Sequence, residues 1–343
     1  MQTGQSPDRG PSWAVVMTVC EPLALVLTNV RWHLATGAAA VFVFVDDPDD
    51  PAAAALGAEP GCHVQICDGL YWRDTVGRAA RPASQMRRQT INANIAQDRC
   101  AADWLFHVDA DEFILQTGDL RAELATQAAG GVEVNLPAYE RLFPHPGPQA
   151  DLFDGAFRAT APDGIDARAA YGPFESFMKR GQYSHGAGKS GVPVGGRFRL
   201  GVHNATIRGT KPARRAPKHV SQTARLLHFD GLTPLHWVMK AVRYRLTPPK
   251  VQQAILQPHR AAQIDWMVER GETLAAALGA HRDLFALTPE RRAQLDAFGL
   301  FEAARFDPRA VLGAAVPDLS VAAFDAELHA RNPWFAPMMR SGR

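Results

Sequence analysis

The sequence lacks any long apolar run. The longest clean one, from Ala38 to Val45, has the length of a strand and falls well short of the roughly 18 residues that a membrane span needs. The first residues, MQTGQSPDRGPS, are polar and contain no apolar segment of the kind that directs secretion. A transmembrane protein and a Sec-exported protein are therefore not expected, and we expect a cytoplasmic location.

Cysteine is scarce, and the charge is balanced. The four cysteines (Cys20, Cys62, Cys67 and Cys100) form no C-x-x-C pair and have no metal-type spacing with histidine, which fits a reducing compartment. The 37 basic and 35 acidic residues leave a net charge of +2, so the composition does not indicate a nucleic-acid-binding protein. With 46% apolar residues, the chain can bury a sizeable core.

The N-terminal third alternates strand and helix patterns. Trp13 to Val19 and Ala40 to Val45 are continuous apolar runs typical of buried strands, and Leu23 to Thr36 between them has helical spacing. A strand, a helix and a second strand of these lengths form a βαβ unit, so the two strands are predicted to be parallel. A short strand (Val64 to Cys67), a polar amphipathic helix (Ser84 to Gln97) and a buried strand (Trp104 to Val108) are expected to follow. This order is typical of an open α/β sheet.

The remainder divides into two parts. From Val132 to about Phe229 glycine and proline are frequent, and short strand-like pieces recur at Val132 to Leu136, Arg197 to Val202 and Arg225 to Phe229. Beyond Thr233 we expect four helices: Pro234 to Leu246, Ala261 to Leu278, Pro289 to Ala297 and Val321 to Ala330. The expected organisation is a tail (1–12), an α/β domain (13–231) and a helical C-terminal region (232–343).

The segment WLFHVDADEFIL, Trp104 to Leu115, carries the strongest chemical signal. Its strand ends in Asp109-Ala110-Asp111-Glu112, and three carboxylates beside a core repel one another unless a cation compensates. Asp109 and Asp111 face the same side of an extended chain, at the strand end where parallel sheets bind ligands. Two such carboxylates suit Mg²⁺ or Mn²⁺ held together with substrate phosphates. The alternative is an inert acidic turn. A haloacid-dehalogenase-type phosphatase is excluded, since Phe113 stands where its motif requires Thr or Val.

These features together resemble a known family. The strand followed by Glu21, the strand ending in Asp46-Asp47, the RQTINAN helix and WLFHVDADEF are similar to the family-2-type nucleotide-sugar glycosyltransferases of the GT-A fold, in particular a bacterial subgroup with W-L-x-x-x-D-x-D-E-F. The resemblance covers Trp13 to Leu246. It departs at Val19-Cys20-Glu21, where the family often has Lys-Asn-Glu. It implies a GT-A, Rossmann-like, mainly parallel sheet flanked by helices, with residues 13–115 as the nucleotide-binding half and 116–231 as the acceptor half.

The resemblance also implies residue roles, each of which has a plain structural alternative such as a cap, a solvated turn or a surface position. Glu21 and Asp46 would line the base and ribose; Gln89 and Arg88 would face the diphosphate or sugar. Asp109 and Asp111 would bind the metal, with Asp109 also touching the nucleotide. A late histidine, either His203 or His228, would complete the metal site, although His228 has the neighbours of a core residue. Lys189 would act as a mobile cation that neutralises the leaving diphosphate.

Two further segments of the central region have a pattern of interest. Gly186 to Gly191 matches G-x-G-x-x-G, but no strand precedes it and no helix follows it, so we expect a flexible loop that could close over a donor. The run from Arg208 to His219 carries five Lys and Arg residues. It is expected to be either a solvated loop or a contact to an anionic, lipid-linked acceptor or a membrane surface.

The sequence therefore predicts a metal-dependent, inverting transfer of a sugar from a nucleoside-diphosphate sugar to an acceptor hydroxyl of a saccharide or lipid-linked precursor, as in polysaccharide biosynthesis. Glu175 is the first choice for the acceptor-deprotonating base and Asp151 the second, each with a plain surface acid as the alternative. A catalytically silent GT-A-like domain that binds a nucleotide sugar or glycan is the competing hypothesis. A nucleotidyl transferase is disfavoured because Cys20-Glu21-Pro22 replaces the glycine-rich loop that its first strand would need.

Overall fold

The computed structural model describes residues 10–144, 147–247, 256–271 and 273–335. The chain forms two compact units, each built from two separate stretches. Unit 1 contains the chain up to Pro137 together with Ala187–Leu226, and unit 2 contains Ala138–Gly186 together with the chain from Leu227 onward. Residues 138–186 are thus grouped with the C-terminal residues, whereas the sequence pattern grouped them with the α/β domain.

Unit 1 is organised around a seven-stranded sheet with the order β12-β6-β9-β4-β1-β2-β3. Strand β1 pairs in parallel with β2, as the βαβ pattern predicts, and with β4 on its other side, and β2 pairs in parallel with β3. Strand β9 is antiparallel to both of its neighbours, and β12 is parallel to β6. The sheet is therefore mixed but mainly parallel. Its strands are β1 (Trp13–Val19), β2 (Ala40–Val45), β3 (Cys62–Ile66), β4 (Trp104–His107), β6 (Glu133–Leu136), β9 (Lys189–Pro193) and β12 (Lys218–Val220).

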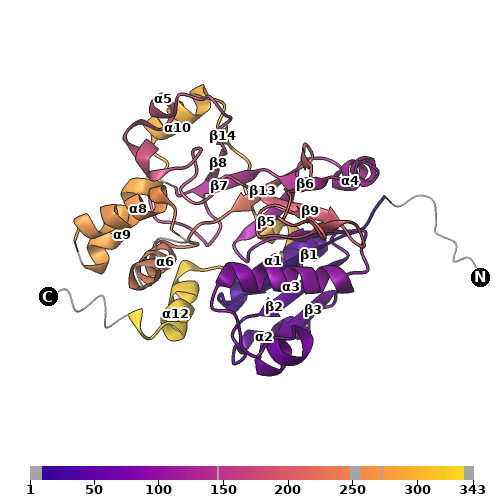
Figure 1. Ribbon diagram of the computed structural model, residues 1–343. Helices are drawn as coiled ribbons and strands as arrows, with labels where there is room; N and C mark the ends of the chain where they lie inside the picture. Colours follow the sequence, from indigo (N-terminus) through magenta and orange to yellow (C-terminus); the bar gives the residue numbers. More distant parts are fainter. Residues whose placement is uncertain (1–9, 145–146, 248–255, 272, 336–343) are drawn as a thin grey trace, which may run out of the picture. The chain divides into compact units, whose positions relative to one another are not determined.

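Helices cover both faces of this sheet. The face that includes Ala14, Val16 and Phe44 packs against Ala93 and Ala96 of α3 (Gln85–Arg99), which Figure 1 shows crossing β1 to β3. The other face meets α1 (Leu23–Ala35), where the ring of Trp13 lies edge-on to that of His33. The remaining elements of unit 1 are α2 (Ala52–Gly57), a short π-helix (Tyr71–Thr75), β5 (Glu112–Gln116), α4 (Leu120–Ala128), β10 (Phe198–Arg199) and β11 (Thr206–Ile207).

Unit 2 combines a small antiparallel sheet with most of the helices after residue 233. Strand β8 pairs with β7 and with β14, and a core beside them includes Leu142, Tyr171 and Leu295. The elements of unit 2 are β7 (Ala138–Leu142), β8 (Ala156–Ala159), α5 (Ala167–Tyr171), a 3-10 helix (Gly172–Phe177), α6 (Pro234–Leu246), α8 (Pro258–Glu269), α9 (Leu274–Phe285), α10 (Pro289–Ala297), β14 (Phe301–Glu302), α11 (Pro308–Leu312), a 3-10 turn (Gly313–Ala315) and α12 (Val321–Arg331). Strand β13 (Ala224–His228) contains the division between the units.

The fold class predicted from the sequence is confirmed: a mixed α/β protein with helices flanking a mainly parallel sheet and a helical C-terminal region. The expected helix from Ala261 to Leu278 is wrong, because α8 and α9 are separate helices. Gly271 has φ +123°, which glycine adopts readily, and the Thr273 side chain accepts the Ala276 N–H where α9 begins. The expected strand from Arg197 to Val202 is reduced to the two residues of β10. Among the described residues, no helix is both long enough and apolar enough to cross a membrane.

Candidate functional site

The carboxyl ends of β1 and β4 mark a reversal in the strand order of unit 1. The chain runs from β1 outward through β2 to β3 and then returns to β4 on the opposite side of β1. In open α/β sheets, ligands bind outside the carboxyl ends of the strands at such a reversal. Glu21 follows β1, Asp46 follows β2 and Asp109 follows β4, so three predicted site residues come from adjacent strand ends.

Asp109, Ala110 and Asp111 form a tight turn that leads into β5. The Glu112 carboxylate accepts the backbone N–H of Asp109 at 2.8 Å, and the Glu112 N–H donates to the Asp109 carbonyl at 3.1 Å. Glu112 is fully buried, and Asp111 is 9% exposed. The turn therefore has a fixed shape and contains two buried acids.

Helix α1 holds this turn and the start of β5 from the other side of the backbone. The Asn29 amide donates to the carbonyls of Ala110 and Glu112 at 3.0 and 2.8 Å. The Trp32 indole donates to the Ile114 carbonyl, and His33 Nε2 accepts the Ile114 N–H at 3.1 Å. Burial lowers the pKa of His33 to about 4, so its ring stays neutral and keeps that acceptor. Helix α1 therefore not only packs against the sheet but also holds the backbone of the turn and of β5 through the polar side chains on its otherwise apolar face.

Two side chains hold the Asp109 carboxylate. Gln89, buried on α3, donates to Oδ1 at 2.6 Å, and the Lys189 ammonium lies 2.7 Å from Oδ2. Lys189 is fully buried and also lies 3.3 Å from Glu112 Oε2. The structure brings Gln89, Asp109 and Lys189 together. It does not place Lys189 as a mobile cation, because the side chain is enclosed and paired with two carboxylates.

The glycine-rich run before Lys189 leads into an interior strand instead of a flexible loop. Gly188 has φ +67°, and a Cβ there would lie 2.1 Å from the Leu136 carbonyl oxygen. A Cβ on Gly191 would lie 2.4 Å from the Phe106 ring. The glycines therefore allow β9 to pack closely against β6 and β4, and the sequence expectation of a closing loop is wrong for Lys189 to Gly191.

Two neutral histidines accompany the acids in unit 1. Burial, together with the Lys189 charge, lowers the pKa of His107 and of His203 to about 4. His107 Nδ1 hydrogen-bonds the Gly201 carbonyl at 2.8 Å, and its Nε2 is buried with no hydrogen-bond partner in the described part of the chain. His203 Nδ1 bonds the Gly188 carbonyl at 3.1 Å. Neutral imidazole is the form that binds metals.

Asp46 forms an ion-pair cluster at the next strand end. Arg88 from α3 makes a two-pronged pair with Asp46 and donates to the carbonyls of Pro82 and Ala83. Arg81 donates to Asp46 Oδ2 at 2.6 Å, and its side chain is 44% exposed. Arg88 is thus engaged with the protein itself rather than turned toward a ligand, whereas Arg81 is accessible. Glu21 is half-buried and accepts the Cys20 N–H at 2.7 Å.

The residues of unit 1 fit a divalent cation by charge and donor type. Asp109, Asp111 and Glu112 carry three negative charges, and Lys189 offsets one of them. Carboxylate oxygens are the donors that Mg²⁺ and Mn²⁺ prefer, and a neutral imidazole such as that of His203 suits Mn²⁺. Asp109 and Asp111 would hold the ion.

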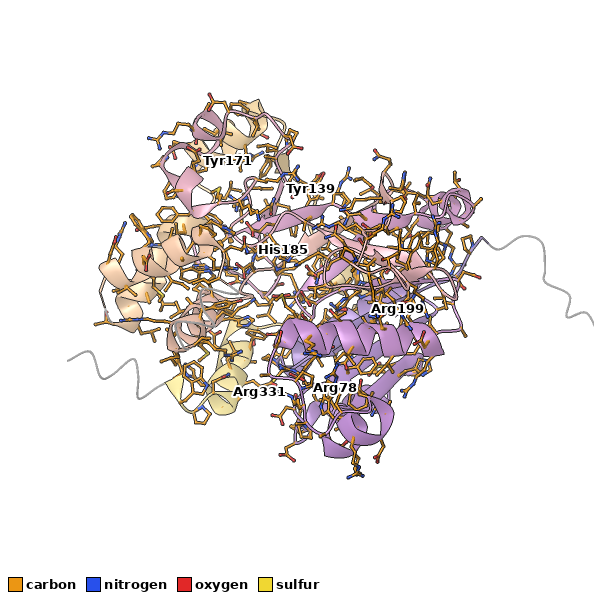
Figure 2. All side chains as sticks on the ribbon, viewed as in Figure 1. Arg78, Tyr139, Tyr171, His185, Arg199 and Arg331 are labelled. Carbon is orange, nitrogen blue, oxygen red and sulfur yellow. The ribbon has the colours of Figure 1, made fainter. Side chains whose placement is uncertain are left out.

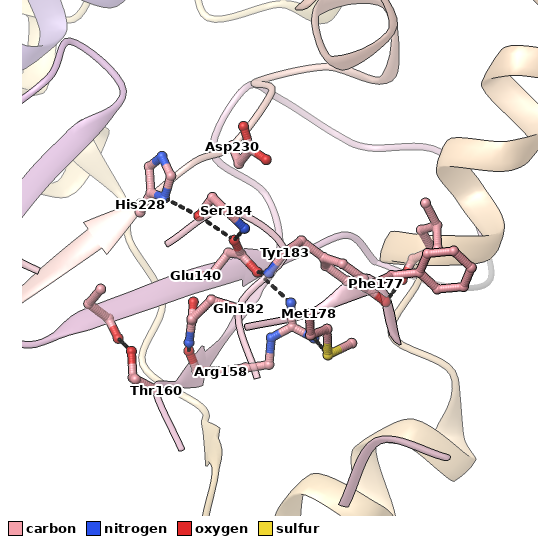
Figure 3. A network of polar contacts seen from close by, with 12 residues as sticks. Glu140, Arg158, Thr160, Phe177, Met178, Gln182, Tyr183, Ser184, His228 and Asp230 are labelled. Carbon is pink, nitrogen blue, oxygen red and sulfur yellow. Dashed lines mark hydrogen bonds and ion pairs between the residues drawn. The ribbon is translucent and has the colours of Figure 1, made fainter. Parts of the chain in front are cut away.

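In unit 2, His228 belongs to a buried polar network (Figure 3). Its Nδ1 lies 2.9 Å from Ser184 Oγ, which lies 2.6 Å from Glu140 Oε1, and Glu140 pairs with Arg158. Because the Glu140 carboxylate accepts the serine hydroxyl, Ser184 Oγ is left to accept Nδ1–H from His228. The ring of His228 also stacks on that of His185 with centroids 5.0 Å apart. His228 is therefore both packed and held in orientation, with Nε2 as its acceptor nitrogen when the ring is neutral.

The two candidate bases lie in different surroundings within unit 2. Glu175 is exposed and lines a pocket of about 820 Å³ with Asp163, Lys179 and His259. Asp151 pairs with Arg309 and accepts the Phe153 N–H, so both of its oxygens are engaged. Of these two acids, Glu175 is the one whose carboxylate is exposed at a pocket.

The basic run from 208 to 219 lies in unit 1. Arg208 and Arg199, the latter labelled in Figure 2, both pair with Asp98 of α3. Lys211, Arg214 and Arg215 are exposed. The run is therefore partly a structural pair with α3 and partly a free basic surface.

Sequence reasoning missed several residues of the site. Asn29 and His33 were hidden in a helix pattern defined by its apolar positions, and His107 in a strand judged by its apolar neighbours. Glu112 was noted as a third acid but given no role. For Asn29, His33 and His107, the sequence feature that could have identified them was a polar residue within an apolar run.

Comparison with known proteins gives distant structural likenesses only. No protein-family model matches the sequence, and no curated protein matches it. A crystal structure of GalNAc-T7 with UDP, GalNAc and Mn²⁺ is similar at 9% identity and a TM-score of 0.37, covering 96% of this chain and 59% of that one. A crystal structure of S. aureus TarS 1-349 is similar at 12% identity and a TM-score of 0.30, covering 96% of this chain and 89% of that one.

A CMP:2-keto-3-deoxy-manno-octonic acid synthetase with CTP is similar over a shorter stretch, at 15% identity and a TM-score of 0.23, covering 37% of this chain and 53% of that one. The chain thus spans between half and three-fifths of the length of this synthetase and of GalNAc-T7. Since all of these TM-scores are below 0.5, we take no residue role from these proteins.

Proposed function

We propose that the protein is a glycosyltransferase of the GT-A type that transfers a sugar from a nucleoside-diphosphate sugar to an acceptor hydroxyl with the help of Mn²⁺ or Mg²⁺. One observation carries the proposal. Asp109 and Asp111 lie in a rigid turn at the carboxyl end of β4, beside the strand-order reversal at β1 where α/β sheets bind nucleotides. The resemblance of WLFHVDADEF to family-2-type enzymes supports the same reading.

The residues of unit 1 would divide the work of binding the donor. Asp109 and Asp111 would hold the cation, which when bound supplies Lewis-acid stabilisation of the leaving diphosphate. Gln89 and Lys189 fix the Asp109 carboxylate in one orientation. Glu21 and the accessible Arg81 on Asp46 stand at the adjoining strand ends, where the base, ribose and phosphates of a nucleotide would lie.

Activation of the acceptor requires a base if the reaction inverts the anomeric centre. We assign this role to Glu175, whose exposed carboxylate lines a pocket of unit 2 large enough for a saccharide. Deprotonation of the attacking hydroxyl by such a carboxylate contributes on the order of 10²–10⁴-fold in rate.

The exposed cations Lys211, Arg214 and Arg215 suit an anionic acceptor such as a lipid-linked precursor of a polysaccharide, or the inner surface of a membrane. A cytoplasmic enzyme that works at that surface is consistent with this patch.

The direct test is Asp111→Asn, measured by the thermal stabilisation that UDP plus Mn²⁺ gives over UDP alone. We expect the Mn²⁺-dependent increment to disappear while the melting temperature of the free protein stays within a few degrees. Asp98→Asn, which removes an exposed acid of α3, is the matched control and should keep the increment. An increment unchanged by Asp111→Asn would contradict the proposal.

The same assay addresses the silent binding domain. Such a domain would bind UDP equally well with and without Mn²⁺ and would not hydrolyse a UDP- or GDP-sugar. Metal-stimulated hydrolysis that Asp111→Asn abolishes would exclude it.

A further inference from the structure

The Lys189 ammonium occupies a position that a cation bound to Asp109 would be expected to fill. It is completely buried, 2.7 Å from Asp109 Oδ2 and 3.3 Å from Glu112 Oε2. Its backbone is fixed as well, since Lys189 begins β9 opposite Leu136 of β6 and follows Gly188 in its left-handed conformation. The backbone that carries the ammonium is therefore held in an interior strand.

The charge of Lys189 is stable in this position. The ammonium lies within 2.7 Å of Asp109 Oδ2 and 3.3 Å of Glu112 Oε2, and these two carboxylates compensate for its removal from water. The pairing is also mutual, because without the ammonium the fully buried Glu112 carboxylate and the partly buried Asp109 carboxylate would carry uncompensated charge. Lys189 thus neutralises part of the acidic cluster permanently.

This arrangement has a consequence for any divalent ion. Oδ1 of Asp109 accepts from Gln89 and Oδ2 faces Lys189, so both oxygens already have donors. An ion bound to Asp109 at about 2.1 Å would stand close to the ammonium and would be repelled by it in a site of low dielectric constant.

We infer that Lys189 is a built-in counter-cation that competes with the divalent ion for Asp109 and keeps the affinity of the site for that ion low. This inference rests on the proposed function, since it concerns the same metal site. A weakly held ion would bind together with the donor diphosphate, whose oxygens supply the missing ligands, and would leave with it.

The test is Lys189→Met, with Mn²⁺ affinity measured by electron paramagnetic resonance of the free ion in the absence of nucleotide. We expect Mn²⁺ to bind at least tenfold more tightly than to the wild type, and Mn²⁺ to raise the melting temperature of the variant more than that of the wild type. Lys218→Met is the matched control, because Lys218 lies in the same unit and pairs with Glu133 instead. Its Mn²⁺ affinity should equal that of the wild type.

An unchanged or weaker affinity in Lys189→Met would overturn the inference and leave the proposed function standing, provided that the wild type binds Mn²⁺. If neither protein binds Mn²⁺ at millimolar concentration, even with UDP present, both the inference and the metal-dependent function fail. A measurement on the wild type guards against a variant that does not fold. The ¹⁵Nζ resonance of Lys189 should shift on saturation with Mg²⁺ plus UDP and not with UDP alone, and a resonance that does not respond to Mg²⁺ would also overturn the inference.

Discussion

At the scale of single residues, carboxylate side chains have different surroundings in different parts of the protein. Asp111 is buried in the turn after β4. Asp151 forms an ion pair with Arg309 and accepts a backbone N–H, whereas Glu175 is exposed and lines a pocket. Two partners occupy the oxygens of Asp151, whereas the carboxylate of Glu175 is exposed at its pocket. Among the predicted bases, the surroundings and not the residue type therefore distinguish Glu175.

Glu175→Gln provides the test at this scale. The amide keeps the shape of the side chain but cannot take a proton, so we expect kcat to fall by about 10²–10⁴-fold with little change in donor KM. Steady-state kinetics with a UDP- or GDP-sugar checks this. Asp163→Asn, an exposed acid of the same pocket, should change kcat less than threefold. Equal effects of the two variants would exclude Glu175 as the base.

At the scale of elements, two continuous apolar strands and one capped helix were the most predictable part. Trp13–Val19, Ala40–Val45 and Pro234–Leu246 have the bounds that the sequence predicts, because buried runs and a Thr233 cap define them locally. Strand β9 was not predictable, because Gly188 and Gly191 read locally as loop residues. Their real function is a close approach to Leu136 and Phe106, which are distant in the sequence.

Another link formed by distant residues connects α4 to the segment before β13. The Glu123 carboxylate accepts hydrogen bonds from His219, Ser221, Thr223 and the Gln222 N–H, and its side chain is 7% exposed. Burial tends to raise the pKa of Glu123, but these hydrogen-bond donors outweigh that effect and lower the pKa to about 2. The carboxylate is therefore stabilised in the folded state relative to the unfolded one.

A folded-state pKa below the unfolded value means that this stabilisation is complete above about pH 4.5 and is lost as the pH falls toward 2. Glu123→Gln should lower the free energy of unfolding at pH 7 by about 2 kcal/mol and flatten the loss of stability between pH 4.5 and 2. Urea denaturation at several pH values measures both. The exposed Glu269→Gln should change stability by less than about 0.5 kcal/mol, and a parallel pH profile for Glu123→Gln and wild type would contradict the assignment.

At the scale of the whole molecule, the two units interleave in sequence, so donor binding and acceptor activation are assigned to residues that alternate along the chain. The predicted site residues Glu21, Asp46, Asp109 and Lys189 all belong to unit 1, whereas Glu175 and His228 belong to unit 2. A linear reading of composition could not find this division, because the chain passes from one unit to the other at Pro137, Gly186 and Leu226 without a linker pattern.

Hydrogen exchange tests the assignment at this scale. Because a ligand stabilises the part that binds it, UDP plus Mn²⁺ at about 100 times Kd should slow the exchange of globally protected amides in 13–137 and 187–226 by up to about 100-fold. Protection confined to 138–186 and 227–335 would place the nucleotide site in unit 2 and contradict the proposed function.

Strands β6 and β9 are adjacent and antiparallel, with Leu136 opposite Lys189. Residues 138–186 are therefore an insertion between two strands that pair as a hairpin does. A short turn in place of that insertion would rejoin the two strands in register. A shortened protein of residues 10–137, such a turn and residues 187–226 would then keep all the strands of the sheet together with its acidic turn. Truncation after residue 231 would instead keep residues 138–186 and remove the helices that they pack against.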